Sequence, residues 1–302
     1  MRRTAILLTV ILLVPWALPL AAEEPPAIQV ILLGTGYPRP DPERAGPSTA
    51  VVVGDRVFIV DAGRNVMTRF WQTQLPSKNL RAVFLTHLHS DHTSGLPDLF
   101  ATTWIFGRSV PLALYGPEGT DKLADALLDY FAEDIRIRRD LTEMRPGAGA
   151  TLRVHAVSDG VVYEDADLRV TAFAVDHKPV APAFGYQFDL LNPEGKSTYS
   201  VVISGDTRPS ENLIKHAKGV DILVHEVYLP EHFDDVDSPE VAVRLKAYHT
   251  SADEVGQVAA AAEVKLLVLT HVIPGNGEKT ILERARKHFK GKIVVGKDLM
   301  RF

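Results

Sequence analysis

Four residues that can bind a metal ion lie within one short stretch of this chain. They are His87, His89, Asp91 and His92, and they follow an apolar segment that ends at Leu85. Three imidazoles this close together repel one another when protonated, so the stretch is typical of neutral histidines that share a cation. Two histidines two positions apart on extended backbone also project to the same side. The spacing therefore predicts a metal site rather than a polar loop with chance histidines.

Further metal-capable residues lie at or just after the ends of three later apolar segments. They are His177, Asp206 and His271. The chain has no cysteine, so a transition-metal site must be built from histidine and carboxylate side chains. One cluster cannot supply the ligands of two metal ions, and we expect these residues to complete them. The donors fit zinc, and iron or manganese remains an alternative.

The segments that carry these residues resemble the metallo-β-lactamase superfamily. The most similar branch contains ribonuclease Z and secreted arylsulfatase-like hydrolases. The matching motifs are THLHSDHTSGL, DHKPVAPAFGY, SGDT, HEVY, YHTSADEVGQVA and LTHV, and the similarity extends from Leu32 to His271. The resemblance implies an α/β fold, a four-layer αββα sandwich, with a dinuclear zinc site at the edge between two β-sheets.

The resemblance also assigns the seven residues to two Zn²⁺ ions. One ion takes His87, His89 and His177, the other takes Asp91, His92 and His271, and Asp206 bridges them. Two such ions lower the pKa of a bridging water towards about 7, which supplies hydroxide at neutral pH. In the family, the aspartate at the position of Asp91 also orients this hydroxide. Because no protein nucleophile is needed, Ser90 and Ser94 are not expected to act as one.

A histidine and a glutamate match a catalytic pair of the ribonuclease Z branch. In that branch the histidine lies near the scissile phosphate and an acidic residue orients it, and the motifs YHTS and HEVY place His249 and Glu226 at these positions. A carboxylate partner holds one tautomer of a histidine and raises its basicity. We therefore expect Asp91, His249 and Glu226 to be catalytic. Asp61 and His225 are expected to support the site.

The elements that must position these residues can be predicted from the pattern of apolar runs. Runs rich in valine and isoleucine, bounded by glycine, proline or aspartate, are typical of strands. They lie at residues 27–34, 49–63, 81–86, 110–116, 168–175, 183–191, 197–206, 220–226, 264–271 and 292–296. Helices are predicted at residues 118–131, 210–217, 251–262 and 279–289, the third with a capping box from Ser251 to Glu254. The order predicts sheets inside and helices outside.

Two other segments and four histidines complete the expectations for the chain. The loop 39–47 is expected to border the site, and the basic segment 135–140 to be a solvated helix end or loop. The remaining histidines lack a motif and are expected to be ordinary surface or packed residues. They are His155, His216, His232 and His288.

The first residues have the layout of a secretory signal peptide. Two arginines precede an apolar run at residues 5–20, which ends at two alanines. We expect cleavage after Ala22, so that residues 23–302 form a single hydrolase domain in the periplasm or outside the cell. The alternative is a permanent membrane anchor, which is less favoured because the run is short and contains two prolines.

A small anionic ester is the substrate that the sequence favours, either a phosphodiester or an aryl or alkyl sulfate. The net charge of −5 gives no general attraction for nucleic acid, and export would separate the chain from precursor transfer RNA. Residues 178–205 also leave no room for the long arm with which bacterial ribonuclease Z grips transfer RNA. Arg64, Lys178 and Arg208 could contact the anion, although each is more simply a surface charge.

Three alternatives to this substrate class stay open. The first is a ribonuclease Z-like RNA endonuclease, and the second a lactonase or β-lactamase type of hydrolase. A metal-binding module without activity is disfavoured, because it would have no use for His249 and Glu226. A redox branch of the superfamily is also disfavoured, because its members typically alter the first cluster of metal-binding residues, which is complete in this chain.

The sequence is also compatible with a homodimer.

Overall fold

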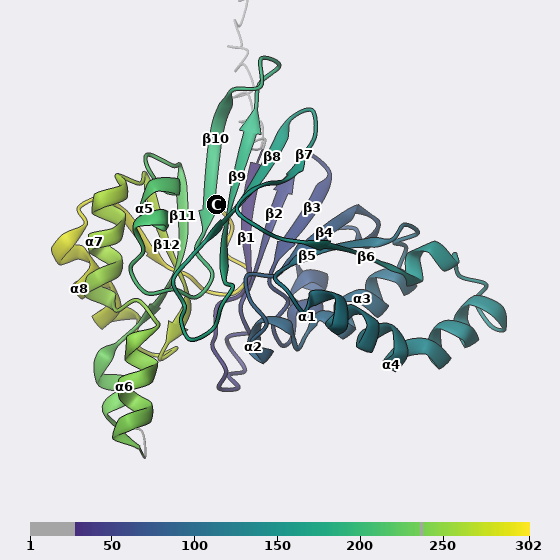
Figure 1. The fold of residues 1–302 in the computed structure, drawn as a ribbon, viewed down its shortest axis with the longest axis horizontal. Helices are drawn as coiled ribbons and strands as arrows, with labels where there is room; N and C mark the ends of the chain where they lie inside the picture. Colours follow the sequence, from purple (N-terminus) through teal and green to yellow (C-terminus); the bar gives the residue numbers. More distant parts are fainter. Residues whose placement is uncertain (1–27, 236–237) are drawn as a thin grey trace, which may run out of the picture.

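Two mixed β-sheets form the centre of the molecule (Figure 1). The computed structural model describes residues 28–235 and 238–302, and the expected signal peptide, residues 1–22, lies outside them. The first sheet contains, in spatial order, β1 (Ile28–Gly34), β2 (Ser48–Val53), β3 (Arg56–Val60), β4 (Leu80–Phe84), β5 (Leu112–Gly116) and β6 (Leu152–Ala156). The second contains β13 (Lys292–Val295), β12 (Leu266–Ile273), β11 (Ile222–Tyr228), β10 (Ser197–Ile203), β9 (Phe184–Leu191), β8 (Leu168–Ala174) and β7 (Gly160–Glu164).

The inner faces of the two sheets pack against each other through a core of aromatic and branched side chains. Phe84 of the first sheet meets Phe188 of the second edge to face, with 5.7 Å between ring centroids. Phe58 and Tyr186 extend the same contact, and all these rings are buried. Alternate residues of a strand point to opposite faces, so each strand also presents a second apolar row outwards.

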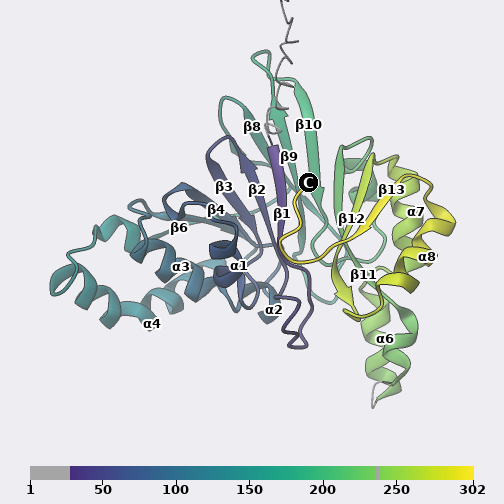
Figure 2. The same ribbon diagram turned by 180° about the vertical axis from the view of Figure 1, so that it is seen from behind.

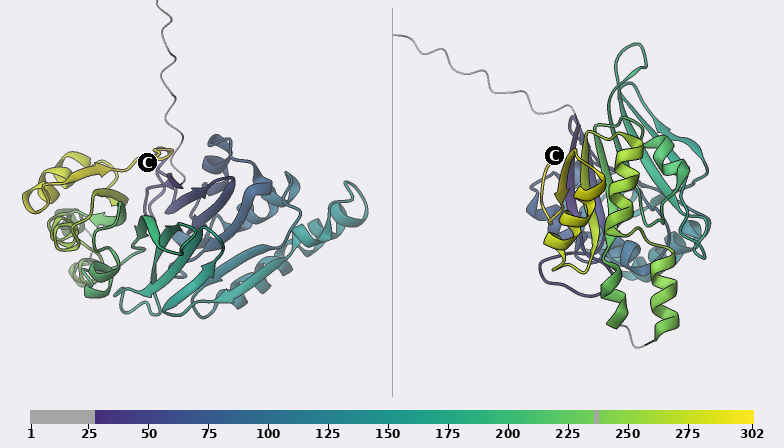
Figure 3. Two further views of the ribbon diagram at one scale, coloured as in Figure 1. Left: turned by 90° about the horizontal axis from the view of Figure 1, so that it is seen from above. Right: turned by 90° about the vertical axis from the view of Figure 1, so that its left-hand side faces the viewer.

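Helices cover these outward rows on both sides of the sandwich, as Figures 2 and 3 show from behind and from above. Beside the first sheet lie α1 (Val66–Gln72), α2 (Ser90–Thr93), α3 (Leu96–Ile105) and α4 (Thr120–Asp140). Beside the second lie α5 (Glu211–His216), α7 (Ala252–Ala262) and α8 (Glu278–His288), while α6 (Pro239–Ala247) projects beyond it. Short 3₁₀ turns complete the chain at η1 (Ser77–Asn79), η2 (Gly147–Ala150) and η3 (Pro230–Asp235). Each outer layer has its own buried apolar cluster.

The layered α/β fold that the sequence predicts is confirmed. Three of the predicted helices agree with α5, α7 and α8 to within a residue or two, and the capping box of Ser251 and Glu254 is present. The helix predicted at 118–131 is longer and includes the basic segment 135–140. The sequence does not reveal β6 and β7, because these short edge strands have few buried residues. Among the described residues, no helix combines the length and apolar character needed to cross a bilayer.

Candidate metal centre

Segments of both sheets bring the seven candidate ligands together. The turn after β4 supplies His87 and His89, and the short helix α2 that follows it supplies Asp91 and His92. The second sheet supplies the other three from the segments after β8 and β10 and from β12. They are His177, Asp206 and His271. Segments far apart in the sequence thus converge on one buried place.

His271 does not end its strand, contrary to the prediction from sequence. β12 continues to Ile273, and His271 is the extra residue of a bulge between Thr270 and Val272, which pair with consecutive residues of β11. Its φ angle of 44° lies in the left-handed region, which is rare for residues other than glycine. The bulge turns the imidazole towards the carboxylates of the site.

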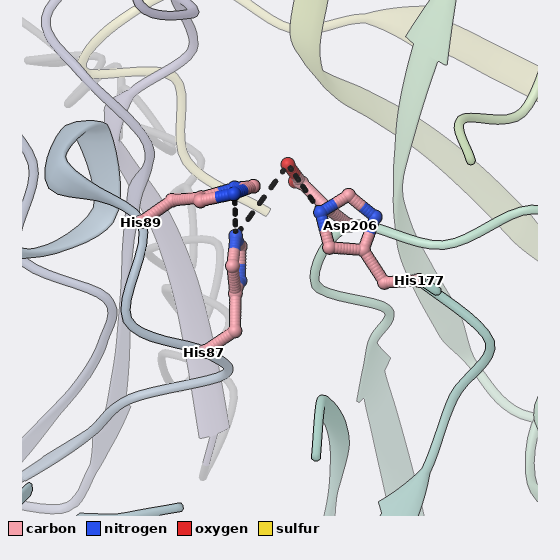
Figure 4. A group of neighbouring side chains, drawn as sticks. All are labelled: His87, His89, His177 and Asp206. Carbon is pink, nitrogen blue, oxygen red and sulfur yellow. Dashed lines mark hydrogen bonds and ion pairs between the residues drawn. The ribbon is translucent and has the colours of Figure 1, made fainter. Parts of the chain in front are cut away.

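The first group of ligand atoms comes from His87, His89, His177 and Asp206. One ligand atom of each lies within 4.8 Å of all the others, and Figure 4 shows the four side chains pointing towards a common space. His87 Nε2 lies 3.0 Å from His89 Nδ1 and 3.8 Å from Asp206 Oδ2. His177 Nε2 lies 4.0 Å from the same Asp206 oxygen.

The second group comes from Asp91, His92 and His271, again with ligand atoms within 4.8 Å of one another. Asp91 Oδ2 lies 3.3 Å from His271 Nε2 and 3.6 Å from His92 Nε2. Asp206 reaches this group as well, at 3.3 Å from His92 and 3.4 Å from His271. The carboxylate of Asp206 therefore lies between the two groups. The structure brings together the two sets that the resemblance implies, while their role as metal ligands stays a prediction.

Hydrogen bonds at the outer ring nitrogens fix how three of these histidines face the site. His92 Nδ1 donates to Asp61 Oδ2 at 2.8 Å, and His177 Nδ1 donates to the carbonyl oxygen of Tyr248 at 2.9 Å. The hydroxyl of Thr86 donates to Asp61, so it accepts from His87 Nδ1 at 2.9 Å. With Nδ1 held in this way, each ring directs its Nε2 to the site, which is the usual arrangement of metal-binding histidines.

The free atoms of the cluster fit a divalent metal. Within the described part of the chain, Nε2 of His92, Nε2 of His177 and Oδ1 of Asp206 are buried without a hydrogen-bond partner. Two nitrogens about 2 Å from one zinc ion lie roughly 3 Å apart, as the nitrogens of His87 and His89 do. Nitrogen and oxygen donors without sulfur suit zinc and also iron or manganese.

The electrostatics of the cluster also suit a cation. Burial, aided by the neighbouring His92, holds the pKa of His87 well below its ordinary value, and burial lowers the pKa of His177 to about 4. Burial opposes ionisation of Asp206, but His271 and His92 keep the pKa of this carboxylate well below its ordinary value. Burial opposes protonation of His92 and His271, but the neighbouring carboxylates raise the pKa of His92 well above its ordinary value and that of His271 to about 9. A bound cation would therefore take the place of these protons between the carboxylates.

His249 and Glu226, the predicted catalytic pair, also lie together at this site. His249 Nδ1 donates to Glu226 Oε1 at 2.9 Å, and both side chains are buried. Glu226 lies on β11, and its Oε1 also accepts the backbone N–H of Thr207 at 2.9 Å. The ring of His249 stacks against that of His271, with 5.6 Å between centroids. A protonated Nδ1 leaves Nε2 of His249 for a substrate.

A cavity of about 340 Å³ opens beside the cluster. Polar residues of the site line it, namely His89, Asp91, Asp206, His249 and His271. The rest of its lining is mainly an aromatic and apolar wall, formed by Tyr37, Pro38, Phe233, Leu245, Tyr248 and Ile273. Arg39 adds an exposed positive charge to this wall. The lining therefore suits a ligand that combines an anion with a flat apolar group.

The sequence located only part of this wall. The loop 39–47 borders the cavity as expected, through Arg39. The three cations proposed to contact an anion do not line it. Arg208 pairs with Asp176 at 3.1 Å, Lys178 is exposed, and Arg64 lies 3.4 Å from the carbonyl of Pro38. Only the YHTS motif could have marked a wall residue, because its tyrosine directly precedes His249.

The remaining histidines lie outside the two groups of ligands. His155 stacks on Tyr115 and His216 on Phe173, with 4.4 and 4.3 Å between ring centroids. His288 is exposed beside Asp253, and the ring of His232 meets that of Tyr37 edge to face. His225 is buried next to Glu226, and its Nδ1 contacts the carbonyl oxygen of that residue at 2.7 Å.

Comparison with known proteins agrees with this geometry. Residues 56–272 match the beta-lactamase superfamily domain. A ribonuclease Z of Mycobacterium marinum is 38% identical over 285 residues, which cover 91% of this chain and 98% of that protein. A ribonuclease Z of Mycobacterium bovis is 37% identical with 91% and 97% covered.

Solved structures share the fold at lower identity. A metallo-β-lactamase fold protein of Bacillus subtilis superimposes with a TM-score of 0.68 at 19% identity, with 91% of this chain and 99% of the other covered. The short form of human tRNase Z gives a TM-score of 0.66 at 22% identity, with 91% and 98% covered.

Proposed function

The chain belongs to the ribonuclease Z branch of the metallo-β-lactamase superfamily, and from this premise we propose that it is a metal-dependent phosphodiesterase that cleaves RNA. The observation that carries the proposal is the position of the His249–Glu226 pair. His249 lines the same cavity as several candidate metal ligands, and the buried carboxylate of Glu226 holds its Nδ1 at 2.9 Å. A metal-binding module without activity would have no use for this pair.

Two zinc ions are the cofactors that the donor set favours, with iron or manganese as alternatives. His87, His89 and His177 would hold one ion, Asp91, His92 and His271 the other, and Asp206 would bridge them. Bound there, such ions would lower the pKa of water and offset the charge of a phosphate.

His249 is the residue placed to protonate the leaving oxygen. Its Nδ1 is held by Glu226 at 2.9 Å, so that its other nitrogen can give a proton to the alkoxide that a broken RNA phosphodiester releases. Glu226 stabilises the protonated ring and keeps one tautomer. Asp91, which lines the cavity between His92 and His271, is placed to accept a hydrogen bond from the attacking water.

The aromatic wall supports a nucleic-acid substrate over a small ester. Tyr37, Phe233 and Tyr248 line the cavity together with several candidate ligands. Bases of single-stranded nucleic acid stack on such rings regardless of their sequence. Arg39 could pair with a neighbouring phosphate. The cavity would then hold a phosphate beside the candidate metal ligands and a base on one of these rings.

Two of the three arguments from the sequence against nucleic acid, the missing arm and the net charge, lose their force. The alignment with the Mycobacterium marinum ribonuclease Z covers 98% of that protein over 285 residues, so that relative has no long arm that this chain lacks. The missing arm is therefore no evidence against RNA. The net charge of −5 describes the whole chain, whereas a strand is recognised locally, at a wall that includes Arg39. Nothing in these relatives favours a sulfate ester over a phosphodiester.

The test is a substrate panel for the metal-loaded protein. It contains single-stranded RNA, bis(p-nitrophenyl) phosphate, p-nitrophenyl phosphate, p-nitrophenyl sulfate, an aryl lactone and nitrocefin. We expect cleavage of the two phosphodiesters. The His249→Ala variant should lose roughly 10²- to 10⁴-fold in kcat on RNA. It should lose far less on the nitrophenyl diester, because nitrophenolate leaves without a proton.

The control is His288→Ala, an exposed histidine outside the site, which should behave like the unchanged protein. Metal analysis should give the same content for all three proteins. Hydrolysis of the sulfate without cleavage of RNA would contradict the proposed substrate and would support the small anionic ester that the sequence favours. An equal loss on both diesters would remove the proton donor role from His249.

Export of the chain is a separate proposal. It is supported by the signal-like composition of residues 1–22 alone, which lie outside the described residues. An exported enzyme would meet RNA outside the cytoplasm. Cell fractionation and N-terminal sequencing of the mature protein test this, and a cytoplasmic protein with an intact N-terminus would refute it.

A further inference from the structure

A small cavity adjoins the candidate metal centre and shares Asp206 and His271 with the larger one. Its volume is about 20 Å³, enough to hold one water molecule. The candidate ligand His92 also lines it, and beyond the ligands its lining includes Ser48, Asp61, Glu226 and Thr270. A space of this size needs polar partners to hold water, and an apolar one stays dry.

Two polar atoms of this lining are buried without a partner in the described structure. They are Ser48 Oγ and Glu226 Oε2, on side chains that are 3% and 1% exposed. The other oxygen of Glu226 already accepts from His249 Nδ1 and from the backbone N–H of Thr207. A buried carboxylate oxygen without a donor is costly, so Glu226 Oε2 requires one.

The strands bring a third polar group to the same place. Ser48 pairs with Gly34 in the β1–β2 ladder, and the hydroxyl of Thr270 lies 3.5 Å from the carbonyl oxygen of Gly34. Thr270 in turn pairs with Glu226 in the parallel β11–β12 ladder, so these two side chains leave the sheet on the same face. Ser48, Glu226 and Thr270 thus converge from both sheets.

We propose that this cavity is a binding site for one ordered water, which joins Ser48 Oγ to Glu226 Oε2. The water donates one proton to Glu226 and uses its remaining capacity on Ser48 and the hydroxyl of Thr270. Ser48 is then a positioning residue that acts through Glu226 on His249. The existence of the water site does not depend on the proposed function. Only its effect on the rate of RNA cleavage rests on that function.

The first test is a high-resolution crystal structure of the metal-loaded protein. We expect density for one water at hydrogen-bond distance, about 2.7–3.2 Å, from both Ser48 Oγ and Glu226 Oε2. In a Ser48→Ala structure this water should be displaced or poorly ordered. A dry cavity, or a direct bond between Ser48 and Glu226, would overturn the proposal. This result does not depend on whether the protein cleaves RNA.

The second test uses the dependence on the leaving group. Ser48→Ala should lower kcat on RNA roughly three- to tenfold, the effect of one lost hydrogen bond, with little change in KM. Hydrolysis of bis(p-nitrophenyl) phosphate should stay unchanged, because that substrate needs no proton donor. The double variant His249→Ala/Ser48→Ala should cleave RNA at the same rate as His249→Ala alone.

The matched control is Ser77→Ala, a buried serine in η1 away from the site, which should match the unchanged enzyme on both substrates. A loss in Ser48→Ala that is equal on both diesters, or that persists without His249, would show a general structural role and overturn the positioning role. If Ser48→Ala does not fold, the proposal is tested by the presence or absence of this water in the crystal structure of the unchanged protein. A protein without ribonuclease activity but with this water would refute the function alone.

Discussion

Asp61 supports two candidate ligands from outside the cluster. It accepts from His92 Nδ1 at 2.8 Å and from the Thr86 hydroxyl that contacts His87. Its own backbone is held at a φ of 60°, an uncommon value for aspartate. The orientation of both histidines therefore depends on the Asp61 carboxylate, which bonds to His92 directly and to His87 through Thr86.

Replacing this carboxylate should weaken metal binding. We expect Asp61→Asn to lower zinc affinity about 10- to 100-fold, because such outer partners orient the ligands and raise their basicity. Titration of the protein against a competing chelator measures this affinity. The exposed Asp98→Asn on α3 is the control. Unchanged affinity in Asp61→Asn would mean that packing alone orients His92.

Tyr248 should contribute to substrate binding through its ring. We expect Tyr248→Leu to raise KM for single-stranded RNA about fivefold or more, because stacking on one ring stabilises a base by about 1–3 kcal/mol. Tyr248→Phe keeps the ring and is the matched control. Steady-state kinetics with RNA and with bis(p-nitrophenyl) phosphate measure both effects. If leucine and phenylalanine at this position give the same KM, stacking is excluded.

Sequence located the candidate ligands of this site better than its walls. Local spacing marks His87 to His92, and the ends of apolar runs mark the others, because metal chemistry restricts residue types strongly. Tyr37 and Phe233 carry no such restriction, since any ring of suitable size could line the cavity. Ser48 is equally inconspicuous, and its interest arises only from a cavity that packing creates.

Among the elements, the N-terminus of α7, which follows His249, should be stabilised by its capping box. Ser251 accepts the backbone N–H of Glu254, and the Glu254 side chain accepts the backbone N–H of Ser251. We expect Ser251→Ala to lower the free energy of unfolding by about 1 kcal/mol. Denaturant unfolding measures this, with Ser251→Thr as a control that keeps the cap. An alanine variant as stable as the threonine one would show that the cap adds nothing.

The long and strongly patterned elements were predictable, and the irregular ones were not. The α7 cap and the apolar runs of the inner strands are readable because they satisfy local rules. The bulge at His271 is not readable, because it depends on how β12 pairs with β11. The short edge strands β6 and β7 are poorly buried and depend on their neighbours for pairing.

At the scale of the whole molecule, an ion pair links the two sheets. Arg56 of β3 bonds to Asp165, which follows β7 and also accepts from Tyr163 at 2.5 Å. Burial opposes the charge of Asp165, but hydrogen bonds from Tyr163 and Arg56 lower its pKa from 3.8 to about 2. A pKa lower in the folded state means that the carboxylate stabilises the fold above its unfolded pKa.

This stabilisation should disappear as the pH falls from about 4 through about 2. Asp165→Asn should therefore be less stable than the unchanged protein near neutral pH, and the difference should shrink across that interval. Urea unfolding at a series of pH values measures it, with the exposed Asp125→Asn as control. A difference that stays constant with pH would exclude the ion pair as its source.

Removing the metal should destabilise the entire fold. A ligand that binds only the folded state stabilises it by RT ln(1 + [L]/Kd), about 4 kcal/mol at a thousandfold excess over Kd. Chelation should therefore lower the Tm, and added zinc should restore it. His92→Ala should show a much smaller response to zinc. Equal Tm values with and without chelator in the unchanged protein would show that the cluster binds no metal.

The division of the ligands between the two sheets also matters during synthesis. The residues from His87 to His92 leave the ribosome early, whereas His271 lies near the carboxyl end of the chain. A growing polypeptide cannot assemble the full set of candidate ligands until residue 271 has been made. A truncated product that stops before this residue therefore cannot contain the complete centre.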